Sequence, residues 1–178
     1  MKKPDVSLVF AQSVDGFYQT NRGDFTPSAE DQTQFAALLT AADATLMGRK
    51  TAEQNINRIR SGLRPGLLRL GLTHHPELFS EYEVAGMLEF KNMPASEAVE
   101  YLIALGKQRI LVLSGGVAND LLRGDQLTSA YLTVEPVLLH QGLKLAGWEQ
   151  KQKKLRTGYP KKLNDRNDIG TKLFVYDL

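Results

Sequence analysis

The sequence predicts a three-layer α/β domain, in which a mixed, mostly parallel β-sheet is flanked by helices and ends in antiparallel C-terminal strands. The first observation is length, because 178 residues fit a single domain spanning residues 1–178. The second is that short apolar runs alternate with helix-period segments as far as Gly124, which is typical of a parallel sheet covered by helices. The third is that strand patterns alone follow this point.

The composition is that of a globular protein. Hydrophobic residues make up 42% and charged residues 24% of the chain, which excludes the disordered, fibrous and membrane-spanning classes. A formal net charge of +2 is far from a nucleic-acid-binding footprint. The absence of cysteine excludes disulfides and thiol nucleophiles and fits a reducing compartment. The apolar run over residues 6–11 is too short for a signal peptide, so we expect a cytoplasmic protein.

The first elements follow from apolar runs and one helix-start signal. Residues 6–11 are nearly all apolar and predict the first buried strand. Ser28 can accept a hydrogen bond from the amide of Asp31, which predicts a helix that begins there and ends near residue 43. Residues 44–47 predict the second strand, and a short helix is expected over residues 49–57.

The middle of the chain repeats this pattern. Residues 67–72 and 87–90 predict strands, with looser residues between them. Apolar residues share one face over residues 96–105, which predicts a helix. A fifth strand is expected at residues 110–113, and a short helix after it ends at Gly124.

The last third of the chain predicts strands without helices. Residues 131–136 and 172–176 have strand patterns, and we expect them to run antiparallel. The basic runs at residues 151–154 and 161–162 are typical of a solvated hairpin or a sheet edge, which we favour over a nucleic-acid patch. Trp148 is expected in the core or in an interface.

Two glycine turns follow apolar runs of the predicted sheet, at the strand ends where open parallel sheets bind ligands. Residues 48–51 (Gly-Arg-Lys-Thr) combine a tight turn, helix-start amides, two cations and a hydroxyl. Residues 114–116 (Ser-Gly-Gly) allow the backbone to approach a pyrophosphate closely. Each turn alone is also typical of an ordinary strand-to-helix connection, but together they predict contacts to the phosphates of a dinucleotide.

Three segments resemble a known family. Residues 12–16, 43–51 and 113–116 look like the bacterial bifunctional deaminase-reductase C-terminal domain, which is the reductase module of riboflavin biosynthesis. The resemblance runs in order from residue 6 to residue 143, and residues 173–176 look like the last strand of the family. It implies a dihydrofolate-reductase-like fold, NADPH as hydride donor and a homodimer.

The resemblance also implies the cofactor contacts, residue by residue. It places Ala11 and Gly16 beside the nicotinamide, and Thr73 and His74 at the adenine ribose. At the adenosine-side phosphates it places Gly48, Arg49, Lys50 and Thr51, and under the pyrophosphate it places Ser114, Gly115, Gly116, Val117 and Ala118. An Arg-Lys pair suits the additional 2′-phosphate, so NADPH is expected in preference to NADH.

The substrate side has several open candidates. Asp31 and Phe35 have the spacing of the substrate-binding helix of dihydrofolate reductases, and Thr133 lies on a strand that resembles the one facing that acid. The Trp-x-Leu-Pro-x-Asp signature of those enzymes is absent, and Asp31 is alternatively a helix-start acid. Ser28, at the same helix start, is a further candidate for substrate binding.

Three further polar residues have a functional and a structural interpretation. Ser13 and Asp15 would lie beside the nicotinamide and hydrogen-bond a polar substrate, or they form an Asp-Gly turn. Glu135 offers a carboxylate at a strand end, or it is simply solvated. The candidate catalytic acids are therefore Asp31, Glu135 and Asp15, with water as the alternative proton source, and the candidate substrate contacts are Ser13, Ser28 and Thr133.

The chain also departs from the family. Ser129 and Ala130 stand where the family usually has Asp-Glu, and His140 stands in place of a glycine-rich turn, which leaves the substrate open. His74 and His75 are adjacent and would point to opposite faces of a strand, so no metal site is predicted.

The resulting functional prediction is an NADPH-dependent reductase that resembles the 5-amino-6-(5-phosphoribosylamino)uracil reductase module. The first alternative is a dihydrofolate reductase or a reductase of another small heterocycle or carbonyl. The second alternative is a nucleotide-binding module without turnover. The expected partners are a small-molecule substrate and a second copy of the chain, with no nucleic acid and no membrane.

Overall fold

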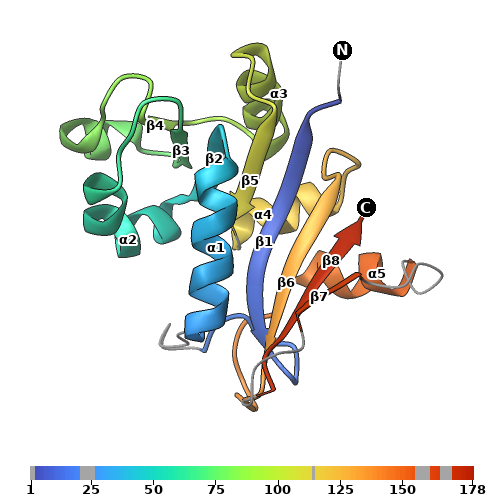
Figure 1. The fold of residues 1–178 in the computed structure, drawn as a ribbon. Helices are drawn as coiled ribbons and strands as arrows, with labels where there is room; N and C mark the ends of the chain where they lie inside the picture. Colours follow the sequence, from blue (N-terminus) through green and yellow to red (C-terminus); the bar gives the residue numbers. More distant parts are fainter. Residues whose placement is uncertain (1–2, 21–26, 114, 155–160, 165–169) are drawn as a thin grey trace.

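The computed structural model describes residues 3–20, 27–113, 115–154, 161–164 and 170–178, which form an eight-stranded sheet with helices on both faces (Figure 1). The order of the strands across the sheet is β4-β3-β2-β5-β1-β6-β8-β7. The strands are β1 (Asp5–Ser13), β2 (Ala44–Gly48), β3 (Leu68–Leu72), β4 (Leu88–Lys91), β5 (Arg109–Leu113), β6 (Ser129–Glu135), β7 (Lys161–Asn164) and β8 (Lys172–Asp177). The helices are α1 (Ala29–Ala41), α2 (Arg49–Ser61), α3 (Ala95–Ala104), α4 (Gly116–Leu122), α5 (Ala146–Lys154) and the 3-10 helix η1 (Pro76–Tyr82).

The strands from β1 to β6 run parallel, and β8 and β7 add an antiparallel edge. The predicted fold class is therefore confirmed. The expected antiparallel arrangement of residues 131–136 and 172–176 is confirmed, because β6 pairs antiparallel with β8. On its other side β6 pairs in parallel with β1, because α4 connects β5 to β6 as a crossover.

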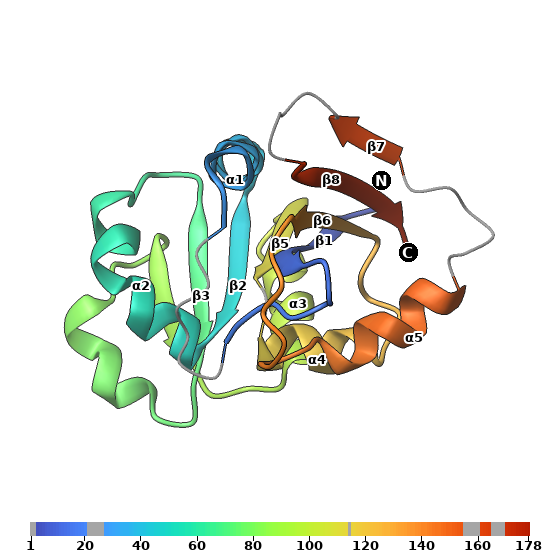
Figure 2. The same cartoon turned by 90° about the horizontal axis from the view of Figure 1, so that it is seen from below.

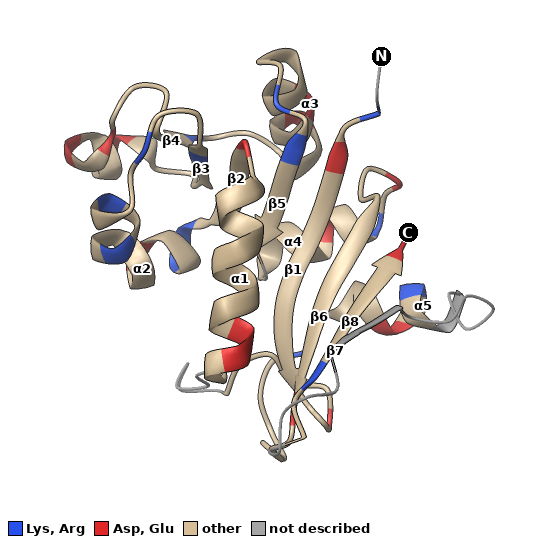
Figure 3. Cartoon of the chain, in the orientation of Figure 1, with Lys and Arg blue, Asp and Glu red and all other residues tan. Residues whose placement is uncertain are grey.

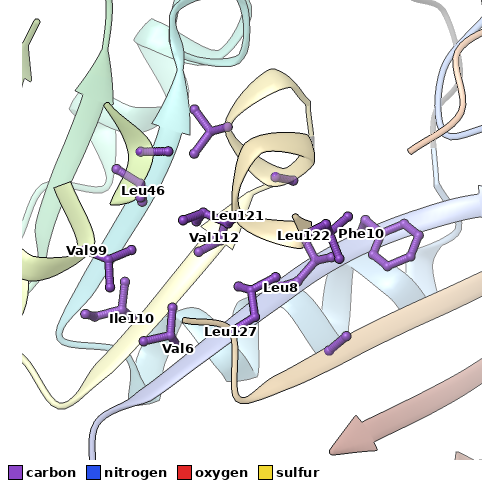
Figure 4. Packing of buried hydrophobic residues seen from close by; sticks show 14 of the residues in the cluster. Val6, Leu8, Phe10, Leu46, Val99, Ile110, Val112, Leu121, Leu122 and Leu127 are labelled. Atoms are coloured by element: carbon purple, nitrogen blue, oxygen red, sulfur yellow. The ribbon is translucent and has the colours of Figure 1, made fainter. Parts of the chain in front are cut away.

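One face of the sheet carries the main core. Phe10 of β1 and Tyr176 of β8 both meet Trp148 of α5 edge to face, with ring centroids 5.1 and 5.0 Å apart. Leu8 lies in the same cluster as Leu122 of α4 (Figure 4). Trp148 is 2% exposed, so its predicted place in the core is confirmed. Burial of these large side chains holds α3, α4 and α5 against this face.

The opposite face is covered by α1 and α2 (Figure 2). Phe79 and Phe90 stack there with ring centroids 4.4 Å apart, in a cluster that includes buried residues of α2. By contrast, α1 contributes no fully buried residue, and its Leu38 and Leu39 are half-buried against Leu111. The position of α1 therefore depends strongly on the contacts at its two ends.

Arginine side chains close the C-terminal ends of α1 and α2. Arg64 donates to the carbonyl oxygens of Leu39 and Thr40 at 2.9 and 3.0 Å. Arg69, which is 5% exposed, donates to the carbonyl of Gly62 at 2.7 Å. These bonds satisfy last-turn carbonyl groups that have no partner within a helix. At the other end of α1, Ser28 accepts from the amide of Asp31 at 3.3 Å, as predicted.

Two helical elements were not expected. The helix α5 lies where strands alone were predicted, and it contains residues 151–154 of the supposed hairpin. A Cβ atom added to Gly147 would lie 2.7 Å from Cβ of Leu122, so the glycine allows α5 to approach α4 closely. The element η1 forms from the looser residues between β3 and β4 because its Phe79 is buried. Among the described residues, no helix is both long and apolar enough to cross a membrane.

Candidate functional site

A cleft of about 1350 Å³ lies at the carboxyl ends of the parallel strands. Its walls come from the start of α2, the residues after β3 and β4, the turn between β5 and α4, and residues 18–20 with Leu143. This is the edge of the sheet at which the sequence predicts a ligand. Figure 3 shows basic residues at the start of α2 and acidic residues at the start of α1.

The two predicted glycine turns meet in this cleft. A Cβ atom added to Gly115 would lie 3.9 Å from Oγ1 of Thr51, and one added to Gly48 would lie 3.5 Å from a methyl group of Val117. Gly115 has φ 120°, in the region that favours glycine. The two connections, which are far apart in the sequence, thus form one continuous wall of backbone and small side chains.

The start of α2 presents helix-start amides and mixed charge to the cleft. Gly48 caps the helix without a side-chain hydrogen bond, and the residues of this first turn line the cleft. Arg49 donates from Nη1 to both carboxylate oxygens of Glu53, at 2.8 and 3.0 Å. Lys50 is exposed and lines the same wall. An incoming anion would therefore compete with Glu53 for the Arg49 guanidinium.

The end of β3 supplies the two residues that were predicted at the adenine ribose. Thr73 and His74 both line the cleft. The Thr73 hydroxyl accepts a hydrogen bond from the amide of His75 at 3.1 Å, which fixes this turn. Asn92, after β4, donates to the carbonyl of His74 at 3.5 Å. The turn is therefore held by side chains from two neighbouring strand ends.

The opposite rim is made by two paired loops. The amide of Tyr18 donates to the carbonyl of Leu143 at 2.9 Å, and the amide of Leu143 donates to the carbonyl of Gln19 at 2.8 Å. Any side chain at Gly142 would collide with the Gln19 carbonyl, so this pairing requires glycine. Tyr18 lines the cleft and is half-buried, and burial raises the pKa of its phenol.

Ser13, Asp15 and Gly16 form a turn outside the cleft. Ser13 is 0% exposed, and its hydroxyl donates to the Asp15 carboxylate at 2.5 Å. This bond, helped by the amides of His140 and Leu139, lowers the pKa of Asp15 to about 2. Ser13 and Asp15 therefore form the predicted turn, and neither lines the cleft. Their contact with a substrate stays a prediction.

A buried polar network lies beside the cleft, at the start of α1. Thr133 donates from its hydroxyl to the Asp31 carboxylate at 2.5 Å, so the expected facing of these two residues is confirmed. The Glu135 carboxylate accepts from the amide of Ser28 at 2.8 Å and from the hydroxyl of Thr171 at 2.9 Å. Glu135 is 4% exposed, so the expectation of a solvated strand-end acid is wrong.

The surroundings of Asp31 raise the pKa of its carboxyl group. Burial is the main cause that raises the pKa of Asp31, and the charge of Glu135 adds to it. The hydrogen bond from Thr133 acts in the opposite direction. The net effect is that Asp31 keeps its proton to a higher pH than an exposed aspartate does.

Most of the predicted cofactor contacts come together in the cleft. Those that line it are Ala11, Gly48, Arg49, Lys50, Thr51, Thr73, His74, Gly115, Gly116 and Val117. Ala118 is 0% exposed and packs in the main core instead, and Gly16 lies in the turn described above. Ser114 lies outside the described residues.

Sequence reasoning missed several residues of the site. Asn92 lines the cleft and directly follows β4, so its place at a strand end could have predicted it, as it predicted the glycine turns. Tyr18 and Leu143 carry no such signal, because they meet only through loop pairing. The sequence around Thr171 does not indicate its role either, since its contact with Glu135 spans 36 positions. The described part of the chain contains no cluster of three or more His, Asp or Glu side chains suited to a metal ion.

Several solved structures have a fold similar to that of this chain. No family model and no curated protein matches the sequence. A protein from Shewanella sp. PV-4 assigned to riboflavin biosynthesis is 18% identical, with a TM-score of 0.69 over 97% of this chain and 98% of that chain. A deaminase/5-amino-6-(5-phosphoribosylamino)uracil reductase from Thermotoga maritima is 16% identical, with a TM-score of 0.71 over 98% of this chain and 56% of that chain.

A third structure with a similar fold is a dihydrofolate reductase. The dihydrofolate reductase from Enterococcus faecalis, complexed with NADP(H), is 16% identical, with a TM-score of 0.60 over 97% of this chain and 95% of that chain. At these identities the likeness shows the fold alone. The predicted dihydrofolate-reductase-like fold is confirmed.

Proposed function

We propose that this chain is an NADPH-dependent reductase that binds the dinucleotide along the cleft. The observation that carries the proposal is the meeting of the two glycine turns in one cleft at the carboxyl edge of the sheet. A cleft of about 1350 Å³ has room for a dinucleotide and a small substrate together. The NADP(H) complex of the structurally similar dihydrofolate reductase supports the choice of cofactor.

The residues of the cleft divide the binding of NADPH between them. The start of α2, with Lys50 and Arg49, would hold phosphates, and the 2′-phosphate would gain a charge-assisted contact that NADH cannot make. The backbone at Gly115 and Gly116, which carries no side chains, would accommodate the pyrophosphate. When bound, NADPH supplies a hydride, and the chain contributes position and electrostatics.

The proposed substrate is a small heterocycle that binds between Asp31 and the nicotinamide end of the cleft. The first candidate is 5-amino-6-(5-phosphoribosylamino)uracil, which the Thermotoga neighbour is named for. The second is dihydrofolate, and the contact between Asp31 and Thr133 favours it. Asp31 is the proposed proton donor, because burial raises its pKa and it keeps its proton to a higher pH than an exposed aspartate does.

A binding titration followed by a turnover assay tests the proposal. NADPH fluorescence is first titrated against the full chain, with NADH as the matched comparison. Oxidation of NADPH is then followed with 5-amino-6-(5-phosphoribosylamino)uracil, dihydrofolate and a set of small carbonyl compounds. We expect binding of NADPH tighter than that of NADH, and oxidation with a heterocycle. Absence of NADPH binding contradicts the proposal, whereas binding without oxidation favours a nucleotide-binding module without turnover.

We also propose that residues 1–178 form a single domain and that two copies assemble into a homodimer. The single sheet that runs through the described residues supports the first part. The family resemblance supports the second. Light scattering coupled to size-exclusion chromatography measures the mass directly, and the mass of one 19.8 kDa chain contradicts the homodimer.

A further inference from the structure

We infer that Glu135 is a positioning residue, whose buried carboxylate anchors the start of α1 and thereby holds Asp31 against Thr133. The inference rests on the proposed reductase function and deepens it, because it identifies the residue on which the placement of the proposed proton donor depends. Glu135 was a candidate acid in the sequence, but its surroundings give it a different role.

The contacts of Glu135 leave it no free oxygen for a substrate. Its Oε1 accepts from the Ser28 amide at 2.8 Å, and its Oε2 accepts from the Thr171 hydroxyl at 2.9 Å. Glu135 and Thr171 are 4% and 2% exposed, and neither lines the cleft. A carboxylate that is buried with both oxygens bonded serves as an anchor, since breaking either bond would leave a buried donor unpaired.

The hydrogen bonds form a closed ring through β6. From Glu135 the ring passes to the amide of Ser28, whose hydroxyl accepts from the amide of Asp31 at 3.3 Å. The Asp31 carboxylate accepts from Thr133 at 2.5 Å, and Thr133 lies two residues before Glu135 on the same face of β6. Two points of β6 thus fix the first turn of α1, and the second point is Asp31 itself.

The ring matters because, among the residues that the structure describes, few other contacts fix this end of α1. No residue of α1 is fully buried, and its half-buried leucines lie in its C-terminal half. Arg64 holds the C-terminal carbonyls, at the far end of the helix. Loss of the Glu135 anchor would therefore let the first turn move, and the Asp31 carboxylate would move with it.

An NMR titration of the full chain tests the inference without a substrate. The Asp31 carboxyl carbon is followed as a function of pH, and its signal is assigned from its loss in Asp31→Asn. Thr133→Val removes a hydrogen bond that lowers the pKa of Asp31, so we expect that pKa to rise in the otherwise unchanged chain. In the Glu135→Gln background the same substitution should produce no rise, because Thr133 no longer reaches Asp31. Equal rises in both backgrounds overturn the inference.

Turnover gives a second, independent measurement. The probes are 7,8-dihydrofolate and 5-amino-6-(5-phosphoribosylamino)uracil, each with NADPH. With a probe that the unchanged chain reduces, Glu135→Gln should lower kcat by at least about tenfold and leave the KM for NADPH unchanged. It should add no further loss in the Asp31→Asn background, and the exposed control Glu100→Gln should change nothing. An unchanged kcat, or an additional loss in that background, overturns the inference.

Two safeguards keep the failures distinguishable. If Glu135→Gln does not fold, Thr171→Val replaces it, because it removes one donor to Glu135 and leaves the carboxylate in place. If the unchanged chain reduces neither probe, the proposed turnover fails, and the NMR titration still decides whether Glu135 positions Asp31.

Discussion

Two regions of the site are built differently. At the proposed phosphate end of the cleft, exposed side chains belong to two local strand-turn-helix connections. At the Asp31 end, side chains from segments far apart in the sequence meet in a buried network. Arg49 and Lys50 are exposed, and their positions follow from residues next to them in the sequence. The bonds of Asp31 with Thr133 and of Ser28 with Glu135 span 102 and 107 positions. The difference implies that the first region controls binding with little effect on stability, and that the second couples function to folding.

The largest expected effect is on stability at the buried end. Glu135→Ala leaves the Ser28 amide and the Thr171 hydroxyl unpaired, so we expect the free energy of unfolding to fall by about 3 kcal/mol. Lys50→Ala, at the exposed end, should change it by less than about 0.5 kcal/mol. Urea denaturation of both variants measures the two values, and similar values would break the comparison.

The next effect is on cofactor affinity at the exposed end. Replacing Arg49 and Lys50 together with alanine removes charge-assisted contacts to the 2′-phosphate, and we expect the Kd for NADPH to rise about 30-fold, which corresponds to about 2 kcal/mol. The Kd for NADH should change by no more than about twofold. Lys107→Ala, before β5 at the opposite end of the sheet, is the control. A parallel loss of NADH affinity would mean that these cations do not recognise the 2′-phosphate.

Asp31→Asn should stabilise the protein above the folded pKa of Asp31 while it lowers turnover. The pKa of Asp31 is raised in the folded chain, so its ionised form opposes folding above that pKa, and the stabilising effect of its proton is complete below the unfolded value of 3.8. The advantage of Asp31→Asn in urea midpoint should therefore shrink as the pH is lowered through the folded pKa. An advantage that does not depend on pH contradicts the assigned cause.

Asp15→Asn should show the opposite sign. The pKa of Asp15 falls from 3.8 to about 2 on folding, so its carboxylate stabilises the protein above the unfolded value. That contribution is lost as the pH falls from 3.8 through about 2. We expect a lower urea midpoint for Asp15→Asn at neutral pH and no difference at the acidic end. A lower midpoint at all pH values would point to lost packing instead.

The smallest expected effect tests competition within the exposed end. Glu53 binds the Arg49 guanidinium, and both side chains are about half exposed, at 43% and 48%. Glu53→Gln should release Arg49 and tighten NADPH binding by about twofold, in line with the modest strength of exposed ion pairs. NADH binding is the internal reference, and an equal gain for both cofactors would rule out competition for the 2′-phosphate.

The predictability of the two regions differs for a physical reason. The turns at residues 48–51 and 114–116 carry their own signal, because glycine, cations and helix-start amides stand next to one another in the chain. From the sequence, Glu135 is interpreted as a solvated strand-end acid, since no neighbouring residue indicates that Thr171 and Ser28 will donate hydrogen bonds to it. The helix α5 was missed in the same way, because Trp148 anchors it in the core through contacts with Phe10 and Tyr176, which are distant in the sequence.

The sequence by itself determined the alternation of strands and helices, the mostly parallel sheet and the pair of glycine turns at its carboxyl edge. These features depend on periodicity and on local backbone geometry, which are properties of short segments. Tertiary structure alone decided that β6 pairs in parallel with β1, that Ser13 and Asp15 close a turn, and that Glu135 is buried beneath the start of α1. Those outcomes depend on which distant groups meet, because the environment of a polar side chain is set by its neighbours in space.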